Sequence, residues 1–165
     1  MADSHRIEDL RRRVHQDPAS IAFAQLAEEL RRSGALEEAV AVCRQGLKRH
    51  PGYVSARVTL GRALLLLGRL DDAAVELEAI LKAAPQNLAA IRALAEIRSR
   101  QGDRRAALGY YNQALMLAPN DPELEQAVAD IAPDVRREVQ AETDREGRVV
   151  AALEQFLHAV HVARA

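Results

Sequence analysis

The chain has 165 residues, of which 48% are hydrophobic and only 3% aromatic, and its formal net charge is −1. A chain of this length that is rich in Ala, Leu, Glu and Arg is typical of one domain of packed helices. The near-neutral charge and the scarcity of aromatic residues argue against a nucleic-acid interface, which needs a concentrated basic stripe and stacking platforms.

Residues 1–19 are predicted to form an N-terminal capping helix. Ser4 stands where an N-cap is expected, and Asp17-Pro18 ends the helix. Its apolar face carries Ile7, Leu10 and Val14. This face is expected to cover the apolar side of the segment that follows.

The sequence has no obvious signal peptide or bilayer span. Residues 1–8 lack the apolar core of a secretory signal, and the longest leucine run, residues 64–67, is far shorter than a span requires. The single cysteine, Cys43, excludes an intrachain disulfide framework, which agrees with a reducing compartment. We therefore expect a cytoplasmic protein that does not insert into a membrane.

Three residue types recur along the chain at one interval of about 34 residues. They are Gly34, Gly68 and Gly102; Ala39, Ala73 and Ala107; and Pro51, Pro85 and Pro119. A leucine followed by a small residue recurs in the same units, at Leu26-Ala27, Leu60-Gly61 and Leu94-Ala95. Such self-similarity indicates an all-α solenoid in which each unit buries its apolar face against its neighbours. The interval predicts three such units.

Each unit is predicted to hold two helices joined by a tight turn. The recurring glycine relieves the left-handed backbone conformation that such a turn commonly demands. Acidic pairs at residues 37–38 and 71–72 favour a helix start beyond the turn, and the recurring proline closes the unit. Cys43 falls on the core face of the second helix of the first unit, so we interpret it as a small buried hydrophobe rather than a reactive thiol.

The recurring columns resemble those of the tetratricopeptide repeat family, whose unit is a helix–turn–helix of this length. The Leu-small pair resembles the Leu-Gly pair of the family's first helix, and the recurring alanine resembles the alanine of its second helix. The resemblance implies a right-handed α-solenoid of three repeats, at residues 20–53, 54–87 and 88–121, with helical caps at both ends. The middle unit departs from the pattern, since the second-helix small position holds Gly46, Ile80 and Ala114 and the large first-helix position holds Phe23, Arg57 and Ile91.

The resemblance also implies a concave groove lined by the first helices. The positions carried over as groove-facing are Ile21, Ala24 and Glu28; Ser55, Val58, Arg62 and Leu65; and Arg92, Glu96 and Ser99. Apolar side chains beside Arg62 and Arg92 would suit an extended or helical peptide with apolar anchors and an acidic group, because arginine pairs bidentately with carboxylate. The alternative is that these arginines form local pairs with Glu28 or Glu96.

The sequence after the repeats is divided into three parts. Residues 122–133 are expected to start a degenerate fourth repeat that stops at Pro133, and residues 134–147 form either a solvated helix or a flexible connector. Residues 148–165 are predicted to form an amphipathic C-terminal helix. Its apolar stripe is Val149, Val150, Leu153, Phe156, Leu157 and Val160. The stripe either folds back on repeat three or the groove of the same molecule, or docks on a second copy or another protein.

The resemblance implies a non-enzymatic adaptor or scaffold that binds a peptide or helix of another protein and needs no cofactor. One alternative is the three-repeat chaperone of type III secretion translocators, which this chain resembles in size and repeat number. The other is a self-assembling, dimeric structural protein that associates through its C-terminal helix. Ala24 and Glu28 stand where heat-shock-binding co-chaperones carry Lys and Asn, which argues against that carboxylate clamp.

His158 and His161, with Glu154 one turn earlier, form a candidate metal-binding face. The border of an amphipathic helix gives the same pattern, so we expect no bound metal. The sequence has no Gly-rich phosphate loop, zinc-type Cys/His cluster or nucleophile motif. We therefore expect no catalytic residues.

Overall fold

The computed structural model describes the backbone of residues 2–163 and the side chains of residues 5–156. Within that range it holds eight helices and no strand, which confirms the all-α prediction. The helices are α1 (Ala2–Gln16), α2 (Ala22–Arg32), α3 (Leu36–Arg49), α4 (Val54–Leu66), α5 (Leu70–Ala83), α6 (Leu88–Arg100), α7 (Arg104–Leu117) and α8 (Pro122–Ala163).

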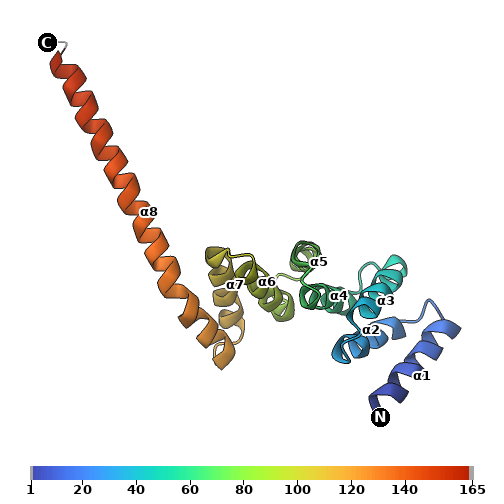
Figure 1. Ribbon diagram of the computed structural model, residues 1–165. Coiled ribbons are helices and arrows are strands. Elements are labelled where there is room, and N and C mark those ends of the chain that lie inside the picture. Colours follow the sequence, from blue (N-terminus) through green and yellow to red (C-terminus); the bar gives the residue numbers. More distant parts are fainter. Residues whose placement is uncertain (1, 164–165) are drawn as a thin grey trace.

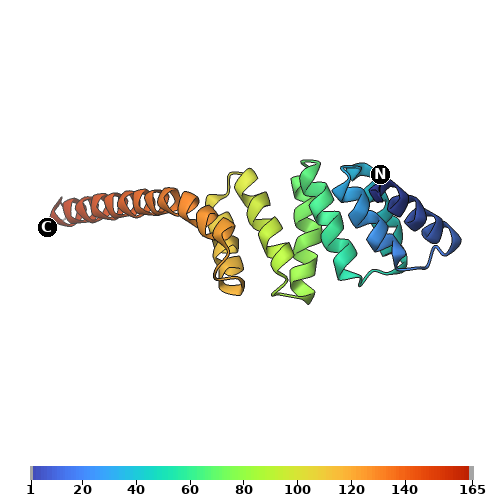
Figure 2. The ribbon, with the colours of Figure 1, turned by 90° about the horizontal axis from the view of Figure 1, so that it is seen from below.

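Helices α2 to α7 form three hairpins that stack side by side (Figure 1, Figure 2). α2 pairs with α3, α4 with α5, and α6 with α7, and successive hairpins touch through α3–α4 and α5–α6. The first helices also contact one another, α2 with α4 and α4 with α6. This arrangement is the α-solenoid that the recurring columns predict.

The turn inside each hairpin depends on a glycine with a positive φ. Gly34, Gly68 and Gly102 have φ angles of 84°, 73° and 81°. Just past the first of them, the Ala35 N–H donates back to the Leu30 carbonyl at 2.9 Å. This bond closes the helix and reverses the chain. The prediction that these glycines take the left-handed conformation is confirmed.

Small residues let the two helices of a hairpin approach closely. A Cβ added at Gly46 would collide with the Phe23 ring, and one at Gly61 would lie 2.7 Å from Leu77. The recurring alanines are completely buried; they are Ala39, Ala73 and Ala107. A larger side chain at any of these positions would overpack the core.

In the middle hairpin the large buried apolar residue at the helix crossing lies on the second helix, whereas in the other two hairpins it lies on the first helix. The equivalent positions of the three units hold Phe23 and Gly46, Arg57 and Ile80, and Ile91 and Ala114, and the first and last of these pairs pack together. Ile80 is buried, whereas the Arg57 guanidinium donates to Glu76 at 2.7 Å. In the middle unit Ile80 thus supplies the buried apolar side chain, and Arg57 pairs with a carboxylate instead of entering the core.

α1 covers one end of the first hairpin. Leu10 is buried against the core, and Arg11 pairs with Glu38 of α3 at 2.7 Å. The prediction that Ser4 caps this helix is wrong, since α1 already begins at Ala2. Ser and Asp are well tolerated in a first helical turn, where the backbone N–H groups lack helical partners, so residues of these types do not force a later start.

Cys43 lies inside the core between α3 and α4, as predicted. It is completely buried, and its thiol donates to the Ala56 carbonyl at 3.4 Å. Burial raises the pKa of the Cys43 thiol to about 12. The thiol therefore stays protonated at neutral pH and behaves as a small hydrophobe.

α8 is a single helix of 42 residues that runs through Pro133. The predictions that Pro133 ends a helix and that a separate helix starts at residue 148 are therefore wrong. A proline removes one helical hydrogen bond, but Pro133 is exposed to water, and ion pairs with α7 hold the helix beyond it. Arg104, for example, reaches Glu138 at 3.4 Å. Residues 134–147 are helical, which excludes the flexible connector.

The C-terminal part of α8, residues 143–163, extends away from the hairpins (Figure 1, Figure 2) and is called the tail. Every described side chain of the tail is exposed. Its large apolar side chains are Val149 (53% exposed), Val150 (54%), Leu153 (56%) and Phe156 (65%). The interpretation that this stripe folds back on its own molecule is wrong, because no turn interrupts α8. The side chains of Leu157 and Val160 lie outside the described residues.

Candidate functional site

Two adjoining cavities run along the first helices of the three hairpins. The first cavity lies mainly between α2 and α4, and the second between α4, α6 and the start of α8. Each has a volume of about 700 Å³. They meet at Arg62 and Ala89, which line both, and together they are called the groove.

Every predicted groove residue except Ile21 and Ser99 lines this groove. The first cavity is lined by Ala24, Glu28, Ser55, Val58 and Arg62, and the second by Arg62, Leu65, Arg92 and Glu96. Ile21 precedes α2 and is 56% exposed, and Ser99 is exposed near the end of α6. These findings concern position, and the role of each residue in binding stays a prediction.

The groove also contains residues that the sequence reasoning missed. Arg6 of α1 lines the first cavity, while Tyr111 of α7 and Leu124 of α8 line the second. The family pattern assigns groove positions only within the first helices of complete units, so it says nothing about α1, α7 or α8. The helical caps expected at both ends were the signal that α1 and α8 would extend the lining.

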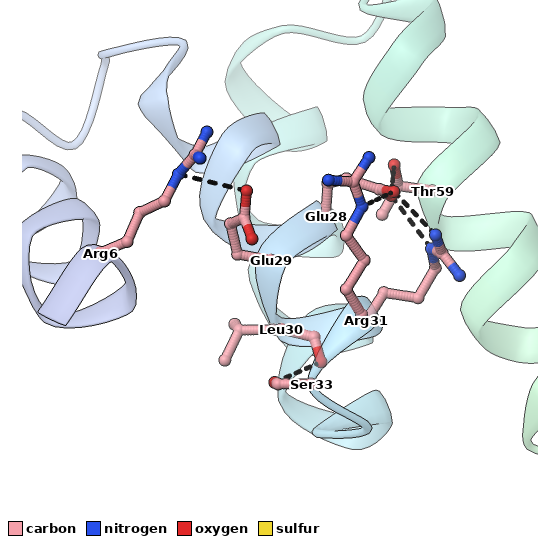
Figure 3. A network of polar contacts seen from close by, with 8 residues as sticks. Arg6, Glu28, Glu29, Leu30, Arg31, Ser33 and Thr59 are labelled. Carbon is pink, nitrogen blue, oxygen red and sulfur yellow. Dashed lines mark hydrogen bonds and ion pairs between the residues drawn. The ribbon is translucent and has the colours of Figure 1, made fainter. Parts of the chain in front are cut away.

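Glu28 is the centre of a polar network on the wall of the first cavity (Figure 3). Its carboxylate accepts hydrogen bonds from Arg31 at 2.7 and 3.0 Å, from Arg32 at 3.0 Å and from the Thr59 hydroxyl at 3.1 Å. The bond from Arg31 is the largest cause that lowers the pKa of Glu28 to about 2. Because its oxygens already accept four bonds, Glu28 joins α2 to α4 and has little capacity left for a ligand.

Arg92 forms ion pairs with carboxylates of its own chain. Its guanidinium donates to Asp121 at 2.6 Å and to Glu123 at 2.9 Å, which joins α6 to the start of α8. The backbone N–H of Leu124, followed by the Arg92 guanidinium, holds the pKa of Asp121 below its ordinary value. Arg92 therefore positions α8, and its charge is largely compensated before any ligand arrives.

Arg62 differs from Arg92 although both line the second cavity. Arg62 is exposed on α4 and forms no ion pair or hydrogen bond with any described residue. The two local partners expected for it are occupied elsewhere, Glu28 by Arg31 and Arg32 and Glu96 by Arg100. The groove thus holds an uncompensated cation at the point where its two cavities meet.

A metal site and a membrane span were also sought among the described residues. Their side chains include no group of three or more His, Cys, Asp or Glu that could hold a metal ion. The candidate face at Glu154 depends on His158 and His161, whose side chains lie outside the described residues. Of the helices between residues 2 and 163, none has both the length and the apolar character that crossing a bilayer requires.

Comparisons with known proteins point to one family. The sequence pattern named Tetratricopeptide repeat matches residues 30–97 and again residues 68–131. Over 78 residues the chain is 38% identical to an uncharacterized protein, y4yS, of Sinorhizobium fredii (strain NBRC 101917 / NGR234). That match covers 47% of this chain and 43% of the relative, so the chain spans less than half the length of that protein.

Solved structures show the same fold. MamA from Desulfovibrio magneticus RS-1 superposes with a TM-score of 0.74 over 93% of this chain and 86% of that one, at 21% identity. A thermophilic TPR protein of Thermus thermophilus superposes with a TM-score of 0.64 over 76% of this chain and 71% of that one, at 27% identity. At 21% identity, the likeness to MamA concerns the fold alone.

Proposed function

Because the chain belongs to the tetratricopeptide repeat family, whose members are generally protein-interaction modules, we propose that it is a non-enzymatic adaptor that binds a segment of another protein in the groove. The segment is an extended or helical peptide with apolar anchors and one acidic group. The observation that carries this proposal is the uncompensated charge of Arg62 at the meeting point of two cavities.

The chemistry of the groove supports an amphipathic ligand. Val54 and Val58 offer apolar surface in the first cavity, and Leu66 and Leu88 do so in the second. A ligand that placed apolar side chains in both cavities would pass over Arg62, where a carboxylate would pair with the guanidinium as no described residue does. Affinity would then come from the apolar contacts and orientation from the arginine.

The two arginines of the groove have different roles in this proposal. Arg62 contacts the ligand, whereas Arg92 keeps the start of α8 in place through Asp121 and Glu123. Reversing the charge of Arg92 would set three acidic groups side by side and loosen the wall of the groove. Arg62 is therefore the cleaner position for a binding test.

The test is a titration of the full chain with fluorescently labelled peptides that combine apolar residues with or without one acidic residue. We expect peptides with the acid to bind, and Arg62→Glu to weaken them by about tenfold or more, because attraction becomes repulsion. Arg44→Glu is the matched control, since Arg44 is exposed on α3, outside the groove, and makes the same charge change. Circular dichroism should be the same for both variants.

The result that would overturn the proposal is a peptide affinity that does not depend on residue 62. Equal weakening by Arg62→Glu and Arg44→Glu would show that net charge, and not the groove, governs binding. Failure of every acidic amphipathic peptide to bind would exclude the stated ligand class.

A further inference from the structure

We infer that the groove of one copy of this chain binds the tail of a second copy, with Glu154 of the tail paired to Arg62. The inference rests on the proposed groove function and names its occupant. Two surfaces that lack a partner among the described residues carry it: the stripe on the tail and the cation in the groove.

The tail presents an apolar face that nothing in the described chain covers. Val149, Val150, Leu153 and Phe156 follow one another at the spacing of one helix face, and each is more than half exposed. A stripe of this kind on an otherwise polar helix is typical of a surface that is buried in an assembly. The tail is therefore suited to docking.

The tail cannot reach the groove of its own molecule. α8 is one unbroken helix of 42 residues, about 63 Å long at the usual helical rise. Arg105 of α7 pairs with Glu142 at 2.7 Å, just before the tail begins, and so holds the helix in its direction. Figure 1 and Figure 2 show the tail leading away from α2, α4 and α6, which line the groove. Contact between tail and groove therefore requires two copies.

The tail has the chemistry that the groove demands. Val150 and Leu153 precede Glu154 and Phe156 follows it, so apolar side chains lie on both sides of one carboxylate. Glu154 is exposed and forms no ion pair with any described residue. The groove has complementary features, since Val58 lines the first cavity, Leu66 lines the second, and Arg62 lies where the two meet. A helix laid along the groove would pair Glu154 with Arg62 while burying the stripe.

Pairing of two tails with each other fits less well. The stripe is only a few helical turns long, so two tails side by side would bury much less than the roughly 1,200 Å² of a stable interface. Glu146 occupies the stripe one turn before Val149 and Val150, and parallel tails would place two such carboxylates face to face. The groove instead offers preformed walls from several helices and a cation.

The experiment is light-scattering mass after size exclusion, over a range of concentrations, on full-length chains. The wild-type chain should form assemblies of two or more copies that dissociate on dilution to 18.1 kDa. Arg62→Glu, which damages the groove, and Leu153→Asp, which damages the tail, should each stay at 18.1 kDa. An equal mixture of these two variants should regain a complex of two chains, because each supplies the surface that the other lacks.

Exchanging the charges of Glu154 and Arg62 tests whether these two residues pair. Glu154→Arg alone should prevent association, and the chain with both Glu154→Arg and Arg62→Glu should regain it. Arg44→Glu should associate like the wild type. Far-ultraviolet circular dichroism shows whether each variant keeps its helices.

Several outcomes would overturn the inference. They are a wild-type chain that stays at 18.1 kDa at every concentration, an Arg62→Glu chain that associates normally, or a mixture that stays monomeric. Normal association of Arg62→Glu together with loss in Leu153→Asp would instead indicate pairing between tails. If association fails while acidic peptides still bind through Arg62, only the occupant is wrong; if the peptides fail as well, the proposed function is wrong too.

Discussion

The hairpins and the tail both contain helices with large apolar side chains, but the hairpins bury these side chains and the tail exposes them. Leu64 in α4 is 1% exposed and Leu153 in the tail is 56% exposed. A positive-φ glycine follows α4 and returns the chain over it, whereas Gly147 lies inside α8 without a positive φ. The position of a turn, more than the apolar pattern itself, decides whether a helix meets its partner in its own chain or must find it elsewhere.

The largest expected effect on the free energy of unfolding is at a buried side chain of the hairpins. Leu64→Ala should lower the free energy of unfolding by about 2–5 kcal/mol, because it removes a buried side chain and leaves a cavity. Leu153→Ala should change it by less than about 0.5 kcal/mol, since the site is exposed and alanine favours helix. Denaturant unfolding of dilute protein, followed by circular dichroism, measures both. A similar loss of unfolding free energy in the two variants would contradict the difference in burial between the hairpins and the tail.

An intermediate effect should come from the network on the groove wall. The pKa of Glu28 is lowered from 4.5 to about 2, so the folded state favours its charged form and this stabilisation is complete above pH 4.5. Glu28→Gln should therefore lower the free energy of unfolding by about 2 kcal/mol at neutral pH, after allowance for partial solvent screening. The difference from the wild type should shrink as the pH falls from 4.5 towards about 2.

Thermal unfolding at a series of pH values measures that difference. Glu154→Gln in the tail is the control, and in dilute protein it should leave the melting temperature unchanged at every pH. A Glu28→Gln difference that did not depend on pH would mean that shape, and not charge, accounts for the contribution of Glu28.

The smallest effects, of opposite sign, should come from two glycines. Gly34→Ala should destabilise the chain by about 1–2 kcal/mol, because its φ of 84° is unfavourable for a residue with a Cβ. Gly147→Ala should stabilise the tail by up to about 1 kcal/mol, because it lies in a helix interior with open space around it. Helical content on mild heating, read by circular dichroism, separates the two. A loss of helix in Gly147→Ala would contradict the helical conformation of residue 147.

Much of the solenoid was predictable because the residues that determine its turns and helix crossings act on neighbouring parts of the chain. The recurring glycine fixes a turn, and the recurring alanine marks a close helix crossing. The continuity of α8 through Pro133 was not predictable, because the contacts that join α8 to α7, such as the ion pair of Arg105 with Glu142, connect residues far apart in the sequence. A local rule for proline takes no account of contacts made by residues far away in the sequence.

The candidate groove shows the same limit. The positions of Arg62 and Leu65 in the lining follow from the family pattern. The different states of Arg62 and Arg92 do not, because the partners of Arg92 lie 29 and 31 residues further along the chain and meet it only once the hairpins stack. Sequence reasoning could identify two cations but not which of them would remain unpaired.

The facing pairs inside the hairpins also limit how such a chain can recombine during evolution. A crossover at the prolines that close the units keeps each bulky residue with its own partner. A crossover at the turn glycines would join the first helix of one unit to the second helix of another and place Ile80 where Gly46 stands, against the Phe23 ring, where not even a Cβ fits. The first unit should therefore accept a crossover at its closing proline more readily than one at its turn glycine.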